Sequence, residues 1–233
     1  MQVIGNGFIG SNFKKILLPK KFIIYAAGVS NSNCRIKSHY KREINQIKRF
    51  ISKINSKRIF IYISSVSVEN KMLKKDRYVK NKLIIESIIK NNVKKYIIIR
   101  LPQIVGKNKN KHTLTNYIFD KLKNTKKFSL WKNSKRNLID IDDVVLIVKN
   151  YLKDNPRLNN VLNIYNPNSV SVKYILKVFE KILKKKVKFV ELNKKNKNTN
   201  LKYLKKKTLL PKKYYKIING KNYVYNVLKK YYQ

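Results

Sequence analysis

The sequence predicts an α/β fold in which a parallel sheet is covered by helices on both faces. Three observations support this prediction. Short apolar segments alternate with longer amphipathic ones, several of the short segments are apolar throughout, and a glycine-rich turn follows the first of them. Strands that are apolar at every position are typical of parallel sheets, because helices bury both of their faces.

The expected elements alternate along the chain. The predicted strands are residues 1–4, 22–25, 58–63, 96–100, 161–165 and 187–192. The predicted helices are residues 8–18, 39–54, 78–90, 114–122, 142–152 and 172–183. The strands are rich in β-branched and aromatic residues, and in segment 39–54 isoleucines recur at helical spacing. Pro19 is expected to end the first helix, and Ser171 to cap the last.

The domain organisation follows from the same pattern. We expect a doubly wound sheet domain over residues 1–160 and a small C-terminal lobe over residues 161–233. Residues 193–200 are polar and low in complexity, which is typical of a loop or linker, and residues 201–233 have only weak periodicity.

The charge of the chain is extreme. Its 233 residues include 56 Lys and Arg but only 11 Asp and Glu, which gives a net charge of +45. Such an excess is also found in proteins that bind nucleic acid. Here the basic residues are spread over the whole chain, and Lys, Asn and Ile, which have AT-rich codons, are all abundant. We therefore interpret most of the charge as a background of codon usage, and nucleic acid is not the expected partner.

The composition excludes several classes of protein. Hydrophobic residues make up 43% of the chain, enough for a packed core, whereas six glycines and a single cysteine, Cys34, exclude collagen and a disulfide scaffold. No apolar run approaches the length of a membrane-spanning helix, and the chain begins directly with a predicted strand. These features predict a cytoplasmic protein.

Residues 5–10 follow the pattern G-x-G-x-x-G between the first strand and the first helix. In this context Gly5 permits a tight turn, Gly7 lets a pyrophosphate approach the backbone, and Gly10 lets helix and strand pack closely. The pattern is typical of a Rossmann-type site, and the alternative is a glycine turn without a ligand. Such sites usually have an acidic ribose ligand about twenty residues later, but the first acidic residue here is Glu43, so NAD and NADP both remain possible.

A tyrosine and a lysine, Tyr78 and Lys82, are four residues apart on one face of a predicted helix. An ammonium group beside a phenol favours its ionised form, so Tyr78 could exchange a proton with an alcohol or ketone. The preceding strand ends in Ser64 and Ser65, at the edge of a parallel sheet where ligands bind. The alternatives are a chance Tyr–Lys pair in a chain rich in both residues and ordinary turn chemistry for the serines.

With these motifs in this order, the chain resembles the extended short-chain dehydrogenases/reductases, which are NAD-dependent epimerase/dehydratases of sugar nucleotides. The resemblance spans residues 1–192. It rests on segments 5–10, 25–28, 64–68, 78–82, 100–106 and 136–144, which come in the order that this family has. The only two alanines of the chain, Ala26 and Ala27, both lie in one of these segments.

The resemblance implies a role for each matching residue. The implied catalytic residues are Ser65, Tyr78 and Lys82. The implied cofactor-binding residues are Gly5, Gly7, Phe8, Ile9, Gly10, Ala26, Ala27, Gly28, Ser64, Lys82 and Pro102. The implied substrate-binding residues are Ser65, Gln103 and Arg136.

The resemblance also implies an activity. We expect an NAD- or NADP-dependent sugar-nucleotide epimerase, dehydratase or 4-keto reductase of surface polysaccharide (O-antigen or capsule) synthesis, with a homodimer as the possible assembly. The alternative is a non-catalytic Rossmann protein that binds a dinucleotide or RNA. The motif set favours the enzyme, since a pure binder does not need the residue set Ser65, Tyr78 and Lys82.

Two departures from the family pattern matter. The family has two more strands between the first helix and the Ala26–Ala27 segment, and here residues 19–22 join them directly, so we expect a smaller sheet without the acidic ribose ligand. The family's usual histidine at the end of the last motif is Asp140 here. Asp140, Asp142 and Asp143 could be read as metal ligands, but Asp142 suits a helix cap, so no metal site is expected.

Overall fold

The computed structural model describes residues 1–108, 110–111, 113–124, 128–186, 189–193 and 210–233. These residues form two units that are interleaved along the chain. The first contains Met1–Leu101, Val144–Ile164 and Leu210, and the second contains Pro102–Asp143, residues 165–193 and Pro211–Gln233. The sequence pattern instead predicts a single boundary after residue 160.

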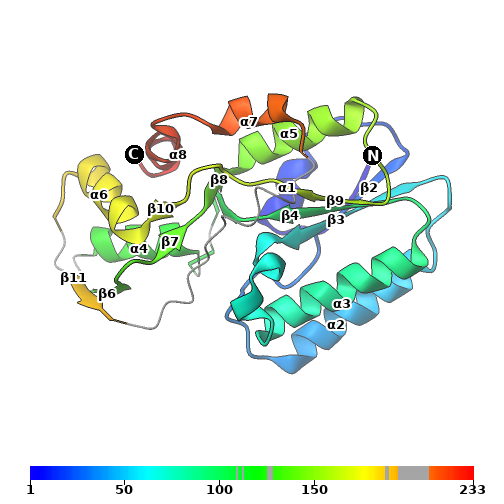
Figure 1. Cartoon of the computed structure of the whole chain (residues 1–233), viewed down its shortest axis with the longest axis horizontal. Coiled ribbons are helices and arrows are strands. Elements are labelled where there is room, and N and C mark those ends of the chain that lie inside the picture. The colour runs from blue at the N-terminus through cyan, green and yellow to red at the C-terminus, as the bar shows by residue number, and fades with distance from the viewer. Residues whose placement is uncertain (109, 112, 125–127, 187–188, 194–209) are drawn as a thin grey trace. The chain divides into compact units, whose positions relative to one another are not determined.

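The first unit is built on a five-stranded parallel sheet in the order β1-β2-β3-β4-β9 (Figure 1). Its strands are β1 (Gln2–Ile4), β2 (Phe22–Tyr25), β3 (Ile59–Ser65), β4 (Tyr96–Leu101) and β9 (Asn160–Asn163). Every residue of β2 and β3 is buried, which explains why these segments are almost entirely apolar. The predicted parallel α/β sheet is confirmed.

Helices cover both faces of this sheet. Figure 1 shows α2 (Lys37–Ile51) and α3 (Arg77–Asn92) together on one face, and on the other α5 (Ile141–Lys153), which belongs to this unit from Val144 onward. The core under α2 and α3 consists of Ile23, Tyr25, Ile47, Phe60, Tyr62, Ile85, Ile89 and Ile98. Burying one such isoleucine stabilises the fold by about 1.5–3 kcal/mol, so this layer fixes how both helices lie on the sheet.

The first strand lies at the edge of the sheet. In the usual Rossmann order, 3-2-1-4-5-6, the first strand is central. Here α1 (Phe8–Phe13) leads straight into β2, which pairs directly with β1, so in the described part of the chain no strand lies beyond β1. The reduction in strand number expected from the sequence is confirmed. The first helix is shorter than predicted, because it ends at Phe13 rather than Leu18.

The second unit combines three small pairs of strands with helices. Its strands are β5 (Gln103–Val105), β6 (Phe128–Trp131), β7 (Lys135–Arg136), β8 (Leu138–Asp140), β10 (Val170–Ser171) and β11 (Phe189–Leu192), paired as β5 with β8, β6 with β11, and β7 with β10. Its helices include α4 (Leu114–Lys123) and α6 (Val172–Leu183). Ser171 caps α6 by accepting a hydrogen bond from the Tyr174 N–H at 3.0 Å, as expected.

Two C-terminal helices were missed from the sequence: α7 (Lys212–Ile218) and α8 (Tyr223–Tyr232). The signal for α8 was present, since Val224, Val227, Leu228 and Tyr231 recur at helical spacing. Val224, Val227 and Leu228 are buried in the core of the second unit, with residues of α4 and α6. The predicted loop over residues 193–200 lies, apart from Asn193, outside the described residues. Among the described helices, none is long and apolar enough to cross a membrane.

The predicted helix cap at Asp142 is wrong. The carboxylate of Asp140 accepts the hydrogen bond from the Asp142 N–H at 3.0 Å, so Asp140 caps α5 and Asp142 lies within the first turn. Helix α5 therefore begins one residue earlier than predicted, at Ile141, because the cap residue is the last residue of β8.

Candidate functional site

The glycine turn between β1 and α1 packs against the end of β2. Gly5 has a φ of 120°, which residues with a side chain rarely adopt, and a Cβ there would lie 2.6 Å from the Ala26 carbonyl oxygen. A Cβ on Gly10 would collide with the carbonyl oxygen of Gly5. Both glycines are therefore required by backbone packing within the first unit, before any ligand is considered.

Gly7 differs from the other two. A Cβ placed on it would meet no atom within 4 Å, so its surface is open, and it is the residue before the first turn of α1. Neither the fold nor a neighbouring side chain requires glycine here. An open glycine beside free helix N–H groups is what the close approach of a phosphate requires. Phe8 and Ile9, the next two residues, are half-buried.

Tyr78 and Lys82 lie on the same face of α3, as their spacing predicts. The Lys82 Nζ atom is 5.6 Å from the centre of the Tyr78 ring. Asp76 caps the helix, since its carboxylate accepts hydrogen bonds from the N–H groups of Tyr78 at 2.9 Å and Val79 at 3.3 Å. This cap holds Tyr78 in the first turn of the helix, where it is half-buried.

Lys82 is only 4% exposed, and its ammonium group has two polar partners. Nζ donates to the Glu43 carboxylate at 2.8 Å and to the Tyr62 hydroxyl at 3.1 Å. Burial by itself lowers the pKa of a lysine, but Tyr62, Tyr78 and Glu43 outweigh it and raise the pKa of Lys82. Lys82 is therefore a permanent cation near neutral pH.

The structure adds Glu43 and Tyr62 to the predicted site. Glu43 lies on α2 and Tyr62 on β3, both within the first unit. Burial also raises the pKa of Tyr62 above its ordinary value, so its hydroxyl stays protonated. The sequence held one signal for Glu43, because it shares the buried spacing of Tyr40 and Ile47 on α2. A carboxylate on that face requires a buried partner.

The two serines at the end of β3 have different contacts. The Ser64 hydroxyl is buried and donates to Glu86 at 2.6 Å, which leaves only the Ser64 main chain for the predicted cofactor role. The Ser65 hydroxyl accepts a hydrogen bond from the Ser67 N–H at 3.2 Å, as in an ordinary turn. Its own proton remains available for a substrate oxygen.

Glu86 belongs to a second buried ion cluster on the same face of the sheet. The Arg100 guanidinium donates to Glu86 through Nε at 2.9 Å and through Nη2 at 2.5 Å, and it also pairs with Glu69. These contacts join α3, β4 and the short helix η1 (Val66–Glu69). These contacts explain why an arginine stands at the end of β4 without any need for a ligand.

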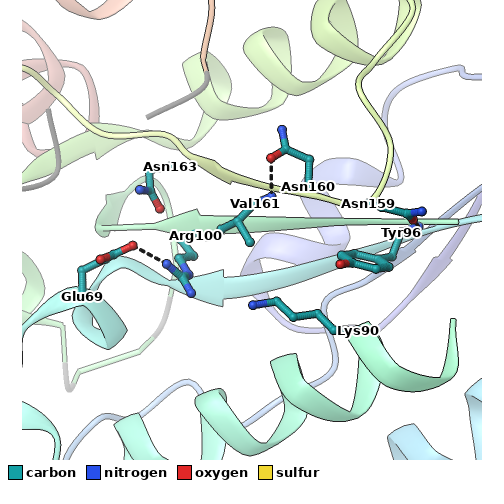
Figure 2. A pocket seen from close by; sticks show the side chains of 8 residues that line it. All are labelled: Glu69, Lys90, Tyr96, Arg100, Asn159, Asn160, Val161 and Asn163. Carbon is teal, nitrogen blue, oxygen red and sulfur yellow. Dashed lines mark hydrogen bonds and ion pairs between the residues drawn. The ribbon is translucent and has the colours of Figure 1, made fainter. Parts of the chain in front are cut away.

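A shallow pocket of about 510 Å³ lies beside this cluster, at the outer strand β9 (Figure 2). Figure 2 shows Arg100 turned toward Glu69, with Lys90 approaching from α3. The lining residues are Glu69, Lys90, Tyr96, Arg100, Asn159, Asn160, Val161 and Asn163. None of the predicted site residues lines this pocket.

The predicted residues Pro102, Gln103 and Arg136 lie in the second unit. Gln103 begins β5, and its side-chain Nε2 atom is buried with no hydrogen-bond partner in the described structure. Arg136 ends β7, where Nη1 donates to the Lys135 carbonyl at 2.8 Å and burial lowers the pKa of the guanidinium. A buried donor without a partner and a partly desolvated cation both favour a polar, anionic ligand.

The three aspartates at the start of α5 are held by side chains of α8. Lys230 pairs with Asp140 at 2.8 Å and with Asp142 at 2.7 Å, and the Tyr231 hydroxyl donates to Asp140 at 2.6 Å. A structural function therefore accounts for this acidic cluster, including Asp140 at the position where the resemblance expects histidine.

Comparisons with known proteins reveal similarity at the level of structure. No family model matches the chain, and no curated protein sequence does. Many solved structures are similar to the chain, and the following three are among those that superpose on nearly its whole length. MoeE5 in complex with UDP-glucuronic acid and NAD has a TM-score of 0.76 at 12% identity and covers 99% of this chain and 97% of its own.

The other two come from named bacteria. RMD from Pseudomonas aeruginosa, complexed with NADPH, has a TM-score of 0.71 at 13% identity, covering 98% of this chain and 96% of its own. UDP-glucuronic acid 4-epimerase from Bacillus cereus, in complex with UDP-glucuronic acid and NAD, has a TM-score of 0.69 at 17% identity. The match covers 97% of this chain and 77% of the epimerase. At these identities the likeness establishes the fold alone, which is a Rossmann-type α/β fold.

Proposed function

We propose that the chain is an extended short-chain dehydrogenase/reductase that uses NAD or NADP to act on a nucleotide sugar, as an epimerase, dehydratase or 4-keto reductase. The observation that carries the proposal is the Tyr78–Lys82 pair, in which a buried cation lies 5.6 Å from a half-buried phenol ring. Both are on helix α3, which packs on a parallel sheet whose first strand leads into a glycine turn. The similar structures solved with NADPH, or with NAD and UDP-glucuronic acid, support this class.

The residues present suit a dinucleotide at the glycine turn. The open surface at Gly7 accommodates a pyrophosphate, and Gly5 and Gly10 give the turn its shape. We assign the pyrophosphate to residues 5–10, including Phe8 and Ile9, and the nicotinamide half to Ala26, Ala27, Gly28, Lys82 and Pro102. The usual acidic ligand of the adenosine ribose has no counterpart, because the strand that carries it is missing.

The chemistry of the protein's own residues is proton transfer and positioning. A bound nicotinamide supplies hydride exchange with a carbon of the sugar. Tyr78 takes the proton of the sugar hydroxyl as the carbonyl forms and returns it when the carbonyl is reduced. Lys82, held as a cation beside the phenol ring, donates to the ribose hydroxyls. Ser65 donates a hydrogen bond to the reacting oxygen.

The nucleotide sugar is assigned to Ser65, Gln103 and Arg136. Gln103 brings an amide N–H group without a partner, and Arg136 brings a cation that burial makes more receptive to a phosphate. A function in surface polysaccharide synthesis and a homodimeric assembly belong to the same proposal, since both are implied by the family resemblance.

The test compares Tyr78→Phe with Tyr96→Phe. The protein is incubated with UDP-glucuronic acid or UDP-glucose and either NAD or NADPH, and products are followed by absorbance at the nicotinamide band and by mass spectrometry. Loss of the phenol proton is expected to lower kcat at least about 100-fold, as loss of a general acid–base usually does. Tyr96 is also half-buried and lies in the same unit, so its variant should keep full turnover. Full turnover by Tyr78→Phe would show that the assignment is wrong.

A further inference from the structure

Glu43 is a buried carboxylate of the first unit with partners on several elements. It is 2% exposed and accepts four hydrogen bonds. Its Oε1 atom accepts from Lys82 Nζ at 2.8 Å and from the Tyr62 hydroxyl at 3.4 Å. Its Oε2 atom accepts from Asn81 Nδ2 at 2.9 Å and from the Val29 N–H at 3.1 Å. One side chain of α2 thus joins β3, α3 and the loop after β2.

The composition makes this position unusual. Only 11 residues of the chain are acidic, against 56 basic ones, and Glu43 is the first of the 11 in the sequence. Most of the basic residues lie on solvated surface, where a charge costs little. Glu43 is instead buried against Lys82, where an unpaired charge would be strongly destabilising. The structure therefore requires these two residues together.

The pair has a direct consequence for the protonation of Lys82. A lysine that is buried without an anion tends to lose its proton, because burial penalises the charged form. The Glu43 carboxylate lies within hydrogen-bond distance and favours the ammonium form instead. It also fixes where Nζ lies, since the carboxylate is itself held by Asn81 and the Val29 N–H.

Gly28 lies directly above the pair. A Cβ on Gly28 would be 2.9 Å from Lys82 Nζ and would collide with Glu43 Oε1. Gly28 is itself exposed, whereas Lys82 and Glu43 are buried. Because Gly28 has no side chain, only its backbone lies over the ammonium group of Lys82. Any other residue at position 28 would displace Lys82 and Glu43.

We propose that Glu43 is a positioning residue that keeps Lys82 cationic and fixes its ammonium group beneath Gly28, where the ribose of the nicotinamide half of a dinucleotide receives its hydrogen bonds. The inference rests on the proposed function for the identity of the ribose. The effect of Glu43 on the charge and place of Lys82 is independent of it.

The experiment measures the protonation of Lys82 in the full-length protein. Brief acetylation with acetic anhydride at pH 7–11 modifies only neutral amines, and mass spectrometry of the peptide containing Lys80 and Lys82 gives both reaction profiles. Lys80 is exposed and serves as the standard in the same peptide. We expect Lys82 to react less than Lys80 across this range in the wild type, and its reaction profile to shift to lower pH by at least one unit in Glu43→Gln.

The matched control is Glu86→Gln. Glu86 is also a buried carboxylate that joins a helix to the sheet, through Arg100 and Ser64, but among the described residues no hydrogen bond or ion pair joins it to Lys82. Its variant should lose comparable stability and leave the Lys82 midpoint unchanged. The other titratable groups that face Lys82 are Tyr25 on β2, Tyr62 on β3 and Tyr78 on α3. They are the same in all variants, so they cannot produce a difference between them.

Binding of NAD and NADP, measured by isothermal titration calorimetry, gives the second readout. Glu43→Gln should weaken binding about 10-fold or more, and Glu86→Gln should not. An unchanged Lys82 midpoint in folded Glu43→Gln would overturn the inference, whatever the dinucleotide does. Absence of any binding by the wild type would instead refute the proposed function, and the acetylation profile would still decide the effect of Glu43.

A variant that does not fold is also informative. If Glu43→Gln fails to fold, the double variant Glu43→Gln, Lys82→Met removes both charges and should restore folding, because the single change leaves an uncompensated buried cation. A double variant that is as unfolded as the single one would show that Glu43 acts on something other than Lys82, and the inference would be wrong.

Discussion

The phenol of Tyr223 donates a hydrogen bond to the Asp143 carboxylate across 2.6 Å, although the two residues are 80 positions apart in the sequence. The same oxygen accepts a hydrogen bond from the Asp140 N–H at 2.9 Å. Tyr223 is the first residue of α8, and both aspartates lie where β8 passes into α5. The C-terminal helix therefore holds the start of α5 within the second unit.

We expect Tyr223→Phe to lower the free energy of unfolding by about 1–3 kcal/mol, because it leaves a half-buried carboxylate and a main-chain N–H without their partner. Urea unfolding followed by circular dichroism measures the change. Tyr174→Phe, on an exposed side chain of α6, is the control and should change stability by less than about 0.5 kcal/mol. Equal stabilities of the two variants would contradict the structural function of this contact.

Two matched substitutions in the glycine turn distinguish its contribution to stability from its contribution to ligand binding. Gly5→Ala is expected to destabilise the protein by about 1–3 kcal/mol, because its φ of 120° is strained for alanine and the Cβ meets the Ala26 carbonyl. Gly7→Ala introduces a Cβ into open space at a φ of −73°, so the unfolding free energy should stay within about 0.5 kcal/mol of wild type.

Gly7→Ala should nevertheless weaken the binding of NAD and NADP, since the methyl group occupies the approach to the backbone. Calorimetric titration of the folded variant checks this expectation, with a loss of 10-fold or more as the expected result. Wild-type affinity in Gly7→Ala would show that the pyrophosphate does not approach the turn, and the assignment of residues 5–10 would be incorrect.

Arg136 is expected to contribute to nucleotide-sugar binding and not to dinucleotide binding. Removing a charged partner of a phosphate typically costs about 1.5–3 kcal/mol, so Arg136→Met should weaken UDP-glucuronic acid binding at least about 10-fold and leave NAD binding unchanged. Lys135→Met removes an exposed cation from the neighbouring position of β7 and is the control. Equal losses in both variants would indicate that general positive charge, rather than Arg136, attracts the nucleotide.

Much of the first unit could be predicted from the sequence because its signals are local. The apolar run 22–25 coincides with β2, and the four-residue spacing of Tyr78 and Lys82 places both on one face of α3. The direct connection from α1 to β2 predicted the smaller sheet. Each of these features depends on residues that are close in sequence, where strand period, helix period and turn chemistry decide the outcome.

The missed features depend on residues that are distant in sequence. The aspartates where β8 passes into α5 have Lys230, Tyr231 and Tyr223 as partners, which are 80 or more positions away in the sequence. The Ser64 hydroxyl, expected beside a cofactor, donates to Glu86 on α3. The spacing of residues in the sequence does not say which charged side chain of another helix or strand a given side chain will contact.

By itself, the sequence determined the alternation of strands and helices, the loss of two strands, the glycine turn and the Tyr78–Lys82 spacing. Only the tertiary structure decided that Glu43 faces Lys82, 39 residues away, and that Gly28 covers the pair. The physical reason is that a buried ammonium group is stable only beside an anion, and the packing of the helices on the sheet determines which anion lies there. In a chain with 11 acidic residues and a net charge of +45, the fold therefore determines which acidic residue pairs with Lys82.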